Sequence, residues 1–219
     1  MTNLIINGDD FGLSTVFNRV ILDLIKDNKI KSTTVMVDRM VASDIQAKQT
    51  QELIDLRATH NLSVGLHLEF TDSDYKSQTQ SQFNKFKSFF ATAPSHLDVH
   101  KANSIPECQP IVAGFCREHG LPKRYHEVPY DGVVSTDGPA FFGSVEKFAD
   151  IEQWISTLKG DHFFEILFHP GQYDPNCQSS LNKDRERDVI HIQQLNSILS
   201  KYNITSASYL DLIKSRNRH

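Results

Sequence analysis

The sequence predicts an α/β fold in which parallel strands alternate with helices along the whole chain. Short β-branched or apolar runs, such as residues 32–37 and 163–169, predict strands. Between such runs, apolar residues recur every three to four positions, as in 17–25, which is the spacing of one helix face. Strict alternation requires right-handed crossovers between parallel strands, so the pattern fits an open, doubly wound sheet or a closed barrel.

The first half of the chain repeats one strand–helix unit. The apolar stretch Leu4–Ile6 predicts the first strand, and Ser14 is a candidate N-cap for the helix that follows. The polar stretch 71–82 is predicted to be a long loop, of the kind that commonly borders a binding site. The other elements predicted in this half are helices at 17–25, 43–57 and 83–90 and strands at 32–37, 62–70 and 96–100.

The second half continues the alternation and contains another long loop, predicted over 129–143. No change in composition and no Pro-, Gly- or Ser-rich linker divides the sequence, which predicts a single domain over residues 1–219. The elements predicted in this half are a helix opened by Pro106, helices at 145–158 and 184–201, strands near 125–128, 163–169 and 205–207, and a terminal helical turn. The predicted strands number about seven in all.

The composition excludes several classes of protein. Hydrophobic residues make up 39% and charged residues 23% of the chain, which is typical of a globular protein. The 23 Lys and Arg residues against 27 Asp and Glu residues give a net charge of −4, and no basic block is long enough to follow a nucleic-acid backbone. We therefore expect no nucleic-acid partner.

The N-terminus and the cysteines predict a cytoplasmic protein. The first apolar run is short and acidic residues follow it, so we expect no signal peptide. No run approaches the roughly 18 apolar residues of a membrane helix, and we expect no membrane association. Cys108, Cys116 and Cys177 form no CxxC pair and leave one unpaired, as expected for reduced thiols.

Acidic and imidazole side chains stand toward the carboxyl ends of the predicted strands. Asp9 and Asp10 follow the first strand, at the position that faces the active site in parallel α/β folds. One aspartate there would be typical of a turn or helix cap, whereas two adjacent ones favour a functional site. His67 is predicted on the opposite strand face from Val64 and Leu66, because side chains alternate along a strand.

Two later strands add to this group. Alternation places His96, Asp98 and His100 on one face, and such a polar face is costly to bury unless it binds something. His169 closes the strand 163–169. One carboxylate and two imidazoles are a common ligand set for a catalytic divalent ion, whereas a structural zinc site usually contains cysteine. The convergence of four strand ends therefore predicts a metal centre.

Other polar residues are predicted to lie outside the site. The run 183–188 alternates in charge, which is typical of a solvated helix start. Six further histidines lie in helical, loop or terminal contexts and are assigned no role: His60, His119, His126, His162, His191 and His219.

Five motifs occur in the same order as in the YdjC-like carbohydrate deacetylases, the family that includes chitooligosaccharide deacetylase. The chain resembles that family over nearly its whole length. The resemblance implies a distorted TIM-like (β/α) barrel that forms homodimers. The motifs are Leu4–Ser14, Ser32–Thr34, Gly65–His67, His96–His100 and His169–Gly171.

The resemblance also implies a role for each candidate side chain. One divalent metal ion, magnesium or zinc, would be held by Asp10, His67 and His100, and Asp9 would be the catalytic base. By analogy with the broader NodB-type deacetylases, His169 would be the general acid.

The sequence departs from the family after the fourth strand. Family members often continue this motif with further histidines, whereas Lys101, Ala102, Asn103 and Ser104 follow His100 here. Because this segment comes directly after a ligand strand, we expect it to line the rim of the site and to influence the choice of substrate. Lys101 would then either contact the sugar or be a solvated surface charge.

These observations predict a metal-dependent hydrolase that removes the N-acetyl group from an acetylated amino sugar or oligosaccharide and releases acetate. Two alternatives remain open. A metal-dependent phosphoesterase could use the same ligands, with Lys101, Arg124 and Arg185 as candidate phosphate clamps. A non-catalytic sugar-binding protein would follow if the changed fourth-strand motif had abolished activity. The same three cationic residues are the candidates for substrate contacts.

Overall fold

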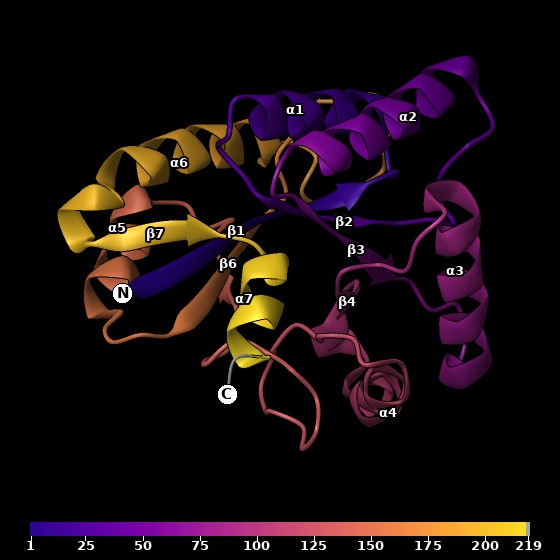
Figure 1. The fold of residues 1–219 in the computed structure, drawn as a ribbon. Helices are drawn as coiled ribbons and strands as arrows, with labels where there is room; N and C mark the ends of the chain where they lie inside the picture. The colour runs from indigo at the N-terminus through magenta and orange to yellow at the C-terminus, as the bar shows by residue number, and fades with distance from the viewer. Residues whose placement is uncertain (218–219) are drawn as a thin grey trace.

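A computed structural model of the chain describes residues 1–217 and contains a seven-stranded, fully parallel sheet that curls around its own interior (Figure 1). The strand order is β4-β3-β2-β1-β6-β5, and β7 pairs with the first half of β1. The strands are β1 (Thr2–Phe11), β2 (Ser32–Val35), β3 (Ser63–Leu68), β4 (Leu97–Val99), β5 (Phe141–Phe142), β6 (Phe163–Phe168) and β7 (Ile204–Ala207).

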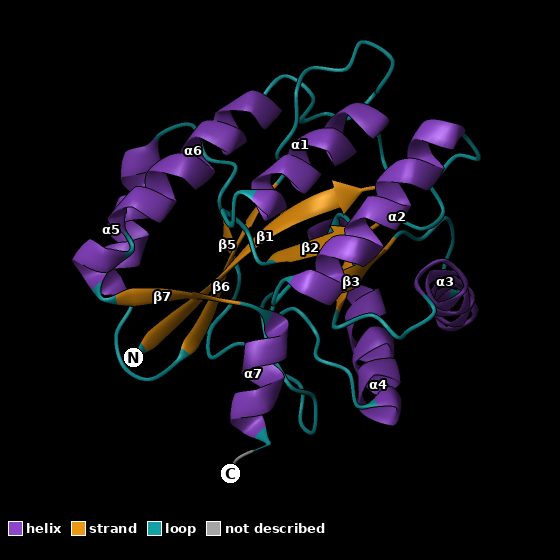
Figure 2. Cartoon of the chain, turned by 45° about the horizontal axis from the view of Figure 1, so that its top comes forward, coloured by secondary structure: helices purple, strands orange, loops and turns teal. Residues whose placement is uncertain are grey.

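The helices lie on the outside of the curled sheet (Figure 2). α1 and α2 run side by side along one part of it, and a serine side chain caps the N-terminus of each: Ser14 for α1, as predicted, and Ser43 for α2. None of the described helices is both long and apolar enough to cross a bilayer. The helices are α1 (Thr15–Lys26), α2 (Asp44–Thr59), α3 (Tyr75–Phe90), α4 (Gln109–His119), α5 (Phe148–Thr157), α6 (Arg185–Ile198) and α7 (Tyr209–Arg216), with short 3₁₀ turns at Ala102–Ser104, Pro106–Cys108 and Ser200–Tyr202.

The two faces of the sheet have opposite character. On β6, Ile166 and Phe168 point outward into the main apolar core beneath the helices, where each such side chain contributes roughly 1.5–3 kcal/mol by leaving water. Glu165 and His169, on the alternate positions, take part in polar contacts of the interior. The curled sheet therefore keeps its apolar residues outside and a polar site inside.

The amino ends of the strands are closed by the C-terminal segment. Tyr209 and Leu212 of α7 are fully buried against Ile5 and Phe163. The Tyr209 ring stacks on His96 with ring centroids 3.7 Å apart. On β3, Gly65 allows this stack, because a Cβ there would overlap the His96 ring.

The distorted barrel is confirmed, but the predicted strand at 125–128 is wrong. Instead, Pro122–Tyr125 is an irregular segment that bridges β4 and β5: the Leu97 N–H donates to Pro122 O at 2.9 Å, and the Ala140 N–H donates to Tyr125 O at 2.7 Å. Isolated bonds of this kind take the place of a regular ladder between the two edge strands, β4 and β5. The number of strands is still seven, because the loop predicted at 129–143 contains the short strand β5.

The polar stretch 71–82 is also not the predicted loop, because α3 begins at Tyr75. The buried face of the first half of α3 carries polar residues, Thr79 and Gln82, that bond to the backbone. The Gln82 side chain accepts from the Glu69 N–H at 3.0 Å and donates to Glu69 O at 2.7 Å. Thr79 donates to Tyr75 O at 2.7 Å. A buried helix face of this composition has no apolar period to reveal it.

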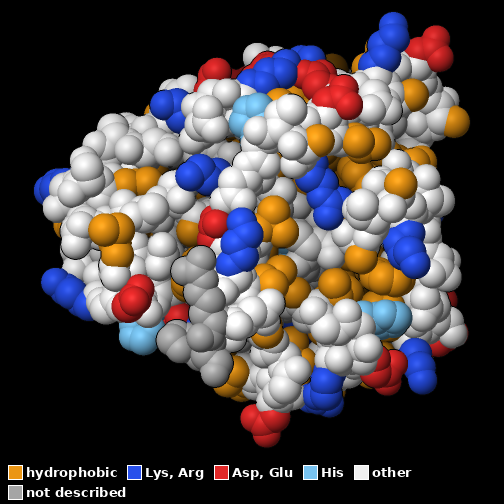
Figure 3. All heavy atoms as spheres, in the orientation of Figure 1, with side chains coloured by type: hydrophobic (Ala, Val, Ile, Leu, Met, Phe, Trp, Pro, Cys, Tyr) orange, Lys and Arg blue, Asp and Glu red, His pale blue; other side chains and the backbone are white. Residues whose placement is uncertain are grey.

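The face of the molecule in Figure 3 carries basic, acidic, hydrophobic and uncharged polar side chains next to one another. Lys and Arg side chains lie singly among acidic and uncharged ones, without a continuous basic patch on that face. This distribution agrees with the slightly negative net charge of the sequence.

Candidate metal centre

A cavity of about 750 Å³ opens at the carboxyl ends of the strands. All five residues that the family resemblance singles out line it: Asp9, Asp10, His67, His100 and His169. They lie on or directly after β1, β3, β4 and β6, so the fold brings side chains from distant parts of the sequence to one cavity. The volume is within the range of small-molecule sites.

An irregularity in β1 lets two consecutive carboxylates face the same cavity. The pairing of β1 with β2 shifts register between Gly8 and Phe11, and Asp10 has a left-handed φ of 73°. In a regular strand Asp9 and Asp10 would point to opposite faces. Such a backbone conformation is strained for an aspartate, and strain of this kind is concentrated at functional sites. The prediction that both aspartates follow the first strand is wrong, because β1 extends through them to Phe11.

Three ligand atoms form a compact triangle in this cavity. His67 Nε2 lies 3.2 Å from His100 Nδ1 and 3.4 Å from Asp10 Oδ1, and the remaining side, from His100 Nδ1 to Asp10 Oδ1, is 3.6 Å. Ligand atoms about 2.0–2.1 Å from a tetrahedral ion lie about 3.3 Å apart, so one ion can reach all three atoms. The cluster is that of the predicted metal ligands.

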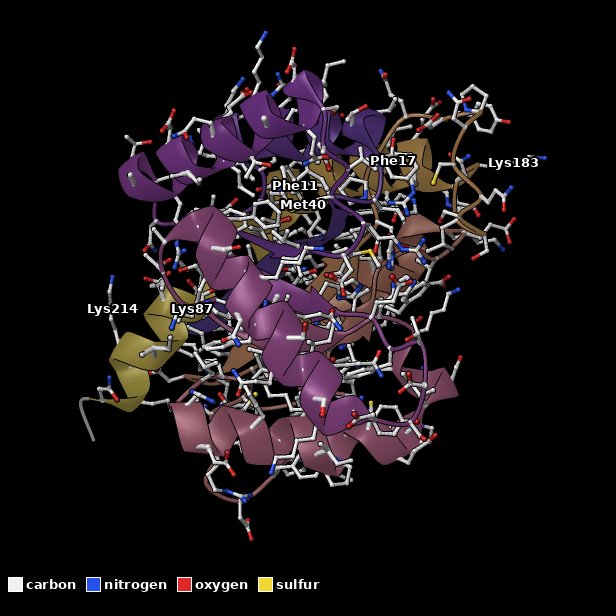
Figure 4. All side chains as sticks on the ribbon, turned by 90° about the vertical axis from the view of Figure 1, so that its right-hand side faces the viewer. Phe11, Phe17, Met40, Lys87, Lys183 and Lys214 are labelled. Atoms are coloured by element: carbon white, nitrogen blue, oxygen red, sulfur yellow. The ribbon has the colours of Figure 1, made fainter. Side chains whose placement is uncertain are left out.

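Arg185 orients the Asp10 carboxylate in this triangle of atoms. The buried Arg185 guanidinium stacks on the ring of Phe17, a buried residue of α1 (Figure 4), with its central carbon 3.9 Å from the ring centroid, and donates to Asp10 Oδ2 at 2.6 Å. Within residues 1–217, the buried Oδ1 atom accepts no hydrogen bond. Burial raises the pKa of Asp10, but His67 and the charges of His169 and Arg185 hold it well below its usual value. An ionised oxygen without a hydrogen bond is what a metal ligand requires.

The second nitrogen of His67 faces a carboxylate. His67 Nδ1 lies 2.8 Å from Asp98 Oδ2, an arrangement typical of metal-bound histidines. Burial lowers the pKa of His67, but Asp9 and Asp98 raise it further, to about 10. The surroundings of His67 therefore favour positive charge at the place where a cation would bind.

Asp9 is held more rigidly than Asp10. Its oxygens accept from Arg124 at 2.8 and 3.0 Å, from Asn7 at 2.6 Å and from Thr34 at 2.5 Å. Burial raises the pKa of Asp9, and Arg124 and His67 lower it by more. Asp9, His67 and Asp98 form a second group with metal-ligand spacing, but the Arg124 guanidinium already supplies a cation there.

The three cationic candidates occupy different positions. Arg124 is buried and also pairs with Asp98 and with Glu165, at 3.0 Å from Nε. Arg185 is buried behind Asp10. Lys101 is exposed on the cavity rim and makes no ion pair within residues 1–217. The segment 101–104 lines the cavity as a whole.

His169 follows β6 and is fixed by residues far away in the sequence. Its Nδ1 lies 3.1 Å from the Ser144 hydroxyl, and its backbone N–H donates to Asp188 Oδ2 at 2.8 Å. Ser144 in turn donates to the same oxygen of Asp188. The Phe142 ring lies on another side of the imidazole, with centroids 5.6 Å apart.

Sequence reasoning missed parts of this site. The run 183–188 was predicted to be solvated; Lys183 does point outward (Figure 4), but Arg185 and Asp188 are buried. His126, to which no role is assigned above, lines the cavity, with Nε2 2.8 Å from Asp98 Oδ1. It lies after α4, directly past the irregular segment Pro122–Tyr125, where no strand period could place it. His219 lies outside the described residues.

Solved structures share this fold. A protein of Enterococcus faecalis with an assumed role in cellobiose-phosphate cleavage superposes with a TM-score of 0.77 at 18% identity, over 96% of this chain and 98% of that one. A polysaccharide deacetylase of Bacillus cereus gives a TM-score of 0.57 at 11% identity, over 95% and 92% of the two chains. Fold and site together define a distorted parallel α/β barrel with a candidate metal centre at the carboxyl ends of its strands.

Sequence comparison finds similarity to the proteins of one family. A family model described as YdjC-like protein matches residues 3–80. A carbohydrate deacetylase of Clostridium beijerinckii is 25% identical over 95% of this chain and 99% of the relative. A chitooligosaccharide deacetylase of Yersinia pestis is 26% identical over 81% of this chain and 85% of the relative. The resemblance to the YdjC-like family is therefore confirmed.

Proposed function

We propose that this protein is a metal-dependent deacetylase that hydrolyses the N-acetyl group of an acetylated amino sugar or oligosaccharide and releases acetate. The observation that carries the proposal is the triangle of Asp10 Oδ1, His67 Nε2 and His100 Nδ1 inside the cavity. Asp9 and His169 line the same cavity and supply a carboxylate and an imidazole for proton transfer. The activities named for the two relatives support the substrate class.

The metal would be a divalent ion, magnesium or zinc, at Asp10, His67 and His100. When bound, such an ion would lower the pKa of water toward about 7 and polarise an amide carbonyl. The side chains fit this task because Arg185 fixes one oxygen of Asp10 and leaves the other for the ion. The fold thus positions the three proposed ligand atoms before any ion binds.

Asp9 is the proposed base that accepts the proton of the attacking water. Its two contacts with Arg124 hold the carboxylate still and keep it ionised at neutral pH. Such a proton transfer is typically worth about 10² to 10⁴ in rate, or roughly 3–5 kcal/mol.

His169 is the proposed acid that protonates the leaving amine. An amine is a poor leaving group as an anion, so the C–N bond breaks only as its nitrogen receives a proton. Asp9 lies against Arg124 and Asp98, whereas His169 lies against Ser144. Base and acid therefore have separate surroundings, as their different roles in proton transfer require.

The charge distribution favours this reaction over phosphoester hydrolysis. A phosphoesterase would need cationic side chains free to bind the phosphate. Arg124 and Arg185 are buried in pairs with carboxylates, which leaves Lys101 of the three candidates at the rim. We therefore propose Lys101 as a substrate contact and the two arginines as residues that position Asp9 and Asp10.

The decisive assay measures acetate release from acetylated chitooligosaccharides and phosphate release from aryl phosphates by the same metal-loaded protein. The proposal predicts acetate only. Phosphate release alone would replace it with a phosphoesterase, and saturable sugar binding without either product would indicate a non-catalytic binding protein. Homodimer formation stays a prediction, which light scattering can test.

A further inference from the structure

A loop serine and a helix aspartate stand behind His169 in a continuous hydrogen-bonded arrangement. Ser144 lies just past β5, and Asp188 lies in the first turn of α6. Gly143 makes the approach possible: its N–H donates to Leu167 O at 2.8 Å, and a Cβ there would overlap the Phe168 ring. The loop is therefore seated directly against β6, with Ser144 beside the imidazole.

The direction of each hydrogen bond in this arrangement is determined by chemistry. An ionised carboxylate can only accept, so the Ser144 hydroxyl must donate its single proton to Asp188 Oδ2. The same oxygen also accepts from the backbone N–H of His169 at 2.8 Å. With its proton used, Ser144 Oγ can only accept from His169 Nδ1, 3.1 Å away. His169 Nδ1 must therefore carry a hydrogen.

We propose that Ser144 and Asp188 are positioning residues that hold neutral His169 in its Nδ1–H tautomer, so that Nε2 is the atom that gains and gives the proton. The inference rests on the proposed deacetylase function for its kinetic consequence. It does not rest on that function for the tautomer, which is a property of the protein alone.

The proton balance follows from this tautomer. His169 first takes a proton on Nε2 and becomes an imidazolium with hydrogens on both nitrogens. During reaction, the water oxygen bonds to the acetyl carbon, its proton passes to Asp9, the C–N bond breaks and the Nε2 proton moves to the departing nitrogen. Acetic acid and a free amine result, and the acid releases its proton to solvent and leaves as acetate. Asp9 gives up the water proton to solvent, and His169, left in the Nδ1–H form from which Ser144 already accepts, takes a new proton on Nε2 for the next turnover. The ring need not rotate during the cycle.

The first test reads the tautomer directly and needs no activity. Imidazole ¹⁵N shifts, assigned to His169 by comparison with His169→Ala, should indicate Nδ1–H and a bare Nε2 in the neutral wild-type ring. Ser144→Ala should shift the ring toward the Nε2–H tautomer or a mixture, whereas Ser144→Thr, which retains the hydroxyl, should restore the wild-type shifts. Identical His169 shifts in the wild type and Ser144→Ala would overturn the proposal, as would a wild-type ring with hydrogen on Nε2.

The second test separates positioning from folding and binding. Ser144→Ala should lower kcat about tenfold to a hundredfold at unchanged KM and metal content, a smaller loss than removal of the acid itself would cause. Ser144→Thr should recover most of kcat. Ser197→Ala, which removes an exposed hydroxyl of α6 bonded only to Gln194 O, should leave every quantity unchanged.

The two tests distinguish the failure of this inference from failure of the proposed function. If the wild-type protein releases no acetate but its His169 shows the Ser144-dependent tautomer, the deacetylase function fails and the positioning pair stands. If acetate is released and Ser144→Ala retains full kcat, the positioning pair fails and the function stands.

Discussion

The two sides of the cavity are built in different ways. On one side, His67 and Asp10 lie on strands and His100 follows directly after β4, so the sheet itself fixes the triangle of ligand atoms. On the other side, His169 depends on Ser144 from a loop and Asp188 from a helix. The first side is suited to holding an ion and the second to directing a proton. Substitutions on the two sides should therefore fail differently: loss of metal on the first, and loss of rate with metal retained on the second.

The largest effect is expected for His100→Ala. His100 is only partly buried, so its removal should abolish metal binding without unfolding the chain. Activity should fall by more than about 10³-fold, because water is then no longer activated. Metal content by elemental analysis and acetate release are the measurements, with His162→Ala, at an exposed histidine, as the matched control. Normal metal content in His100→Ala would show that His100 is not a ligand.

Asp9→Asn should keep the metal and lose the rate. The amide has the shape of the carboxylate but cannot accept the proton of water, so kcat should fall about 10²- to 10⁴-fold. Arg124 retains Asp98 and Glu165 as partners, so the fold should persist. Asp161→Asn, at an exposed aspartate, is the control. A variant with nearly full kcat would remove Asp9 from the mechanism.

The side of the cavity that is built from strands could be predicted from the sequence more easily than the side that depends on a loop and a helix. Strand alternation placed His67, and it placed His96, Asp98 and His100 on one inward face, because each is fixed by its own strand. The barrel was predictable from the motifs, and most strands from their β-branched composition.

The partners of these residues could not be predicted. Arg185 and Asp188 belong to a charged run whose pattern is typical of a solvated helix start. Only the fold shows that Arg185 pairs with Asp10 and that Asp188 accepts a hydrogen bond from the backbone of His169. Arg185 and Asp10 are 175 residues apart in sequence. His126 lies in an irregular segment with no period at all. Pairings between distant, irregular segments leave no local pattern.

Arg185→Met sharpens the comparison because Arg185 lies on α6 but acts on the metal side. It should weaken metal affinity about 10- to 100-fold, since Asp10 loses the contact that orients it. Breaking this buried pair should also lower the free energy of unfolding of the metal-free protein by about 3–5 kcal/mol. Calorimetric titration and urea unfolding are the measurements.

The control for this variant is Arg187→Met, on the same helix, where a partly exposed pair with Asp184 at 3.2 Å should contribute less than about 1 kcal/mol. Equal effects of the two substitutions would contradict the assignment of Arg185 to Asp10.

The smallest effect is expected for Lys101→Ala at the rim. An exposed charge contributes up to about 1 kcal/mol, so KM should rise about two- to fivefold while kcat and metal content stay the same. Steady-state kinetics on several acetylated sugars are the measurement, and the control is Lys183→Ala, at an exposed lysine that points outward (Figure 4). Unchanged KM on every sugar would leave Lys101 without a role in binding.

The central claim is that one divalent ion at Asp10, His67 and His100 makes this cavity a deacetylase site. It is tested most directly by stripping the wild-type protein with a chelator and titrating magnesium or zinc back while acetate release is recorded. The account predicts no acetate from the stripped protein and full recovery with one bound ion per chain. Acetate release at the original rate from protein that contains no metal would contradict it.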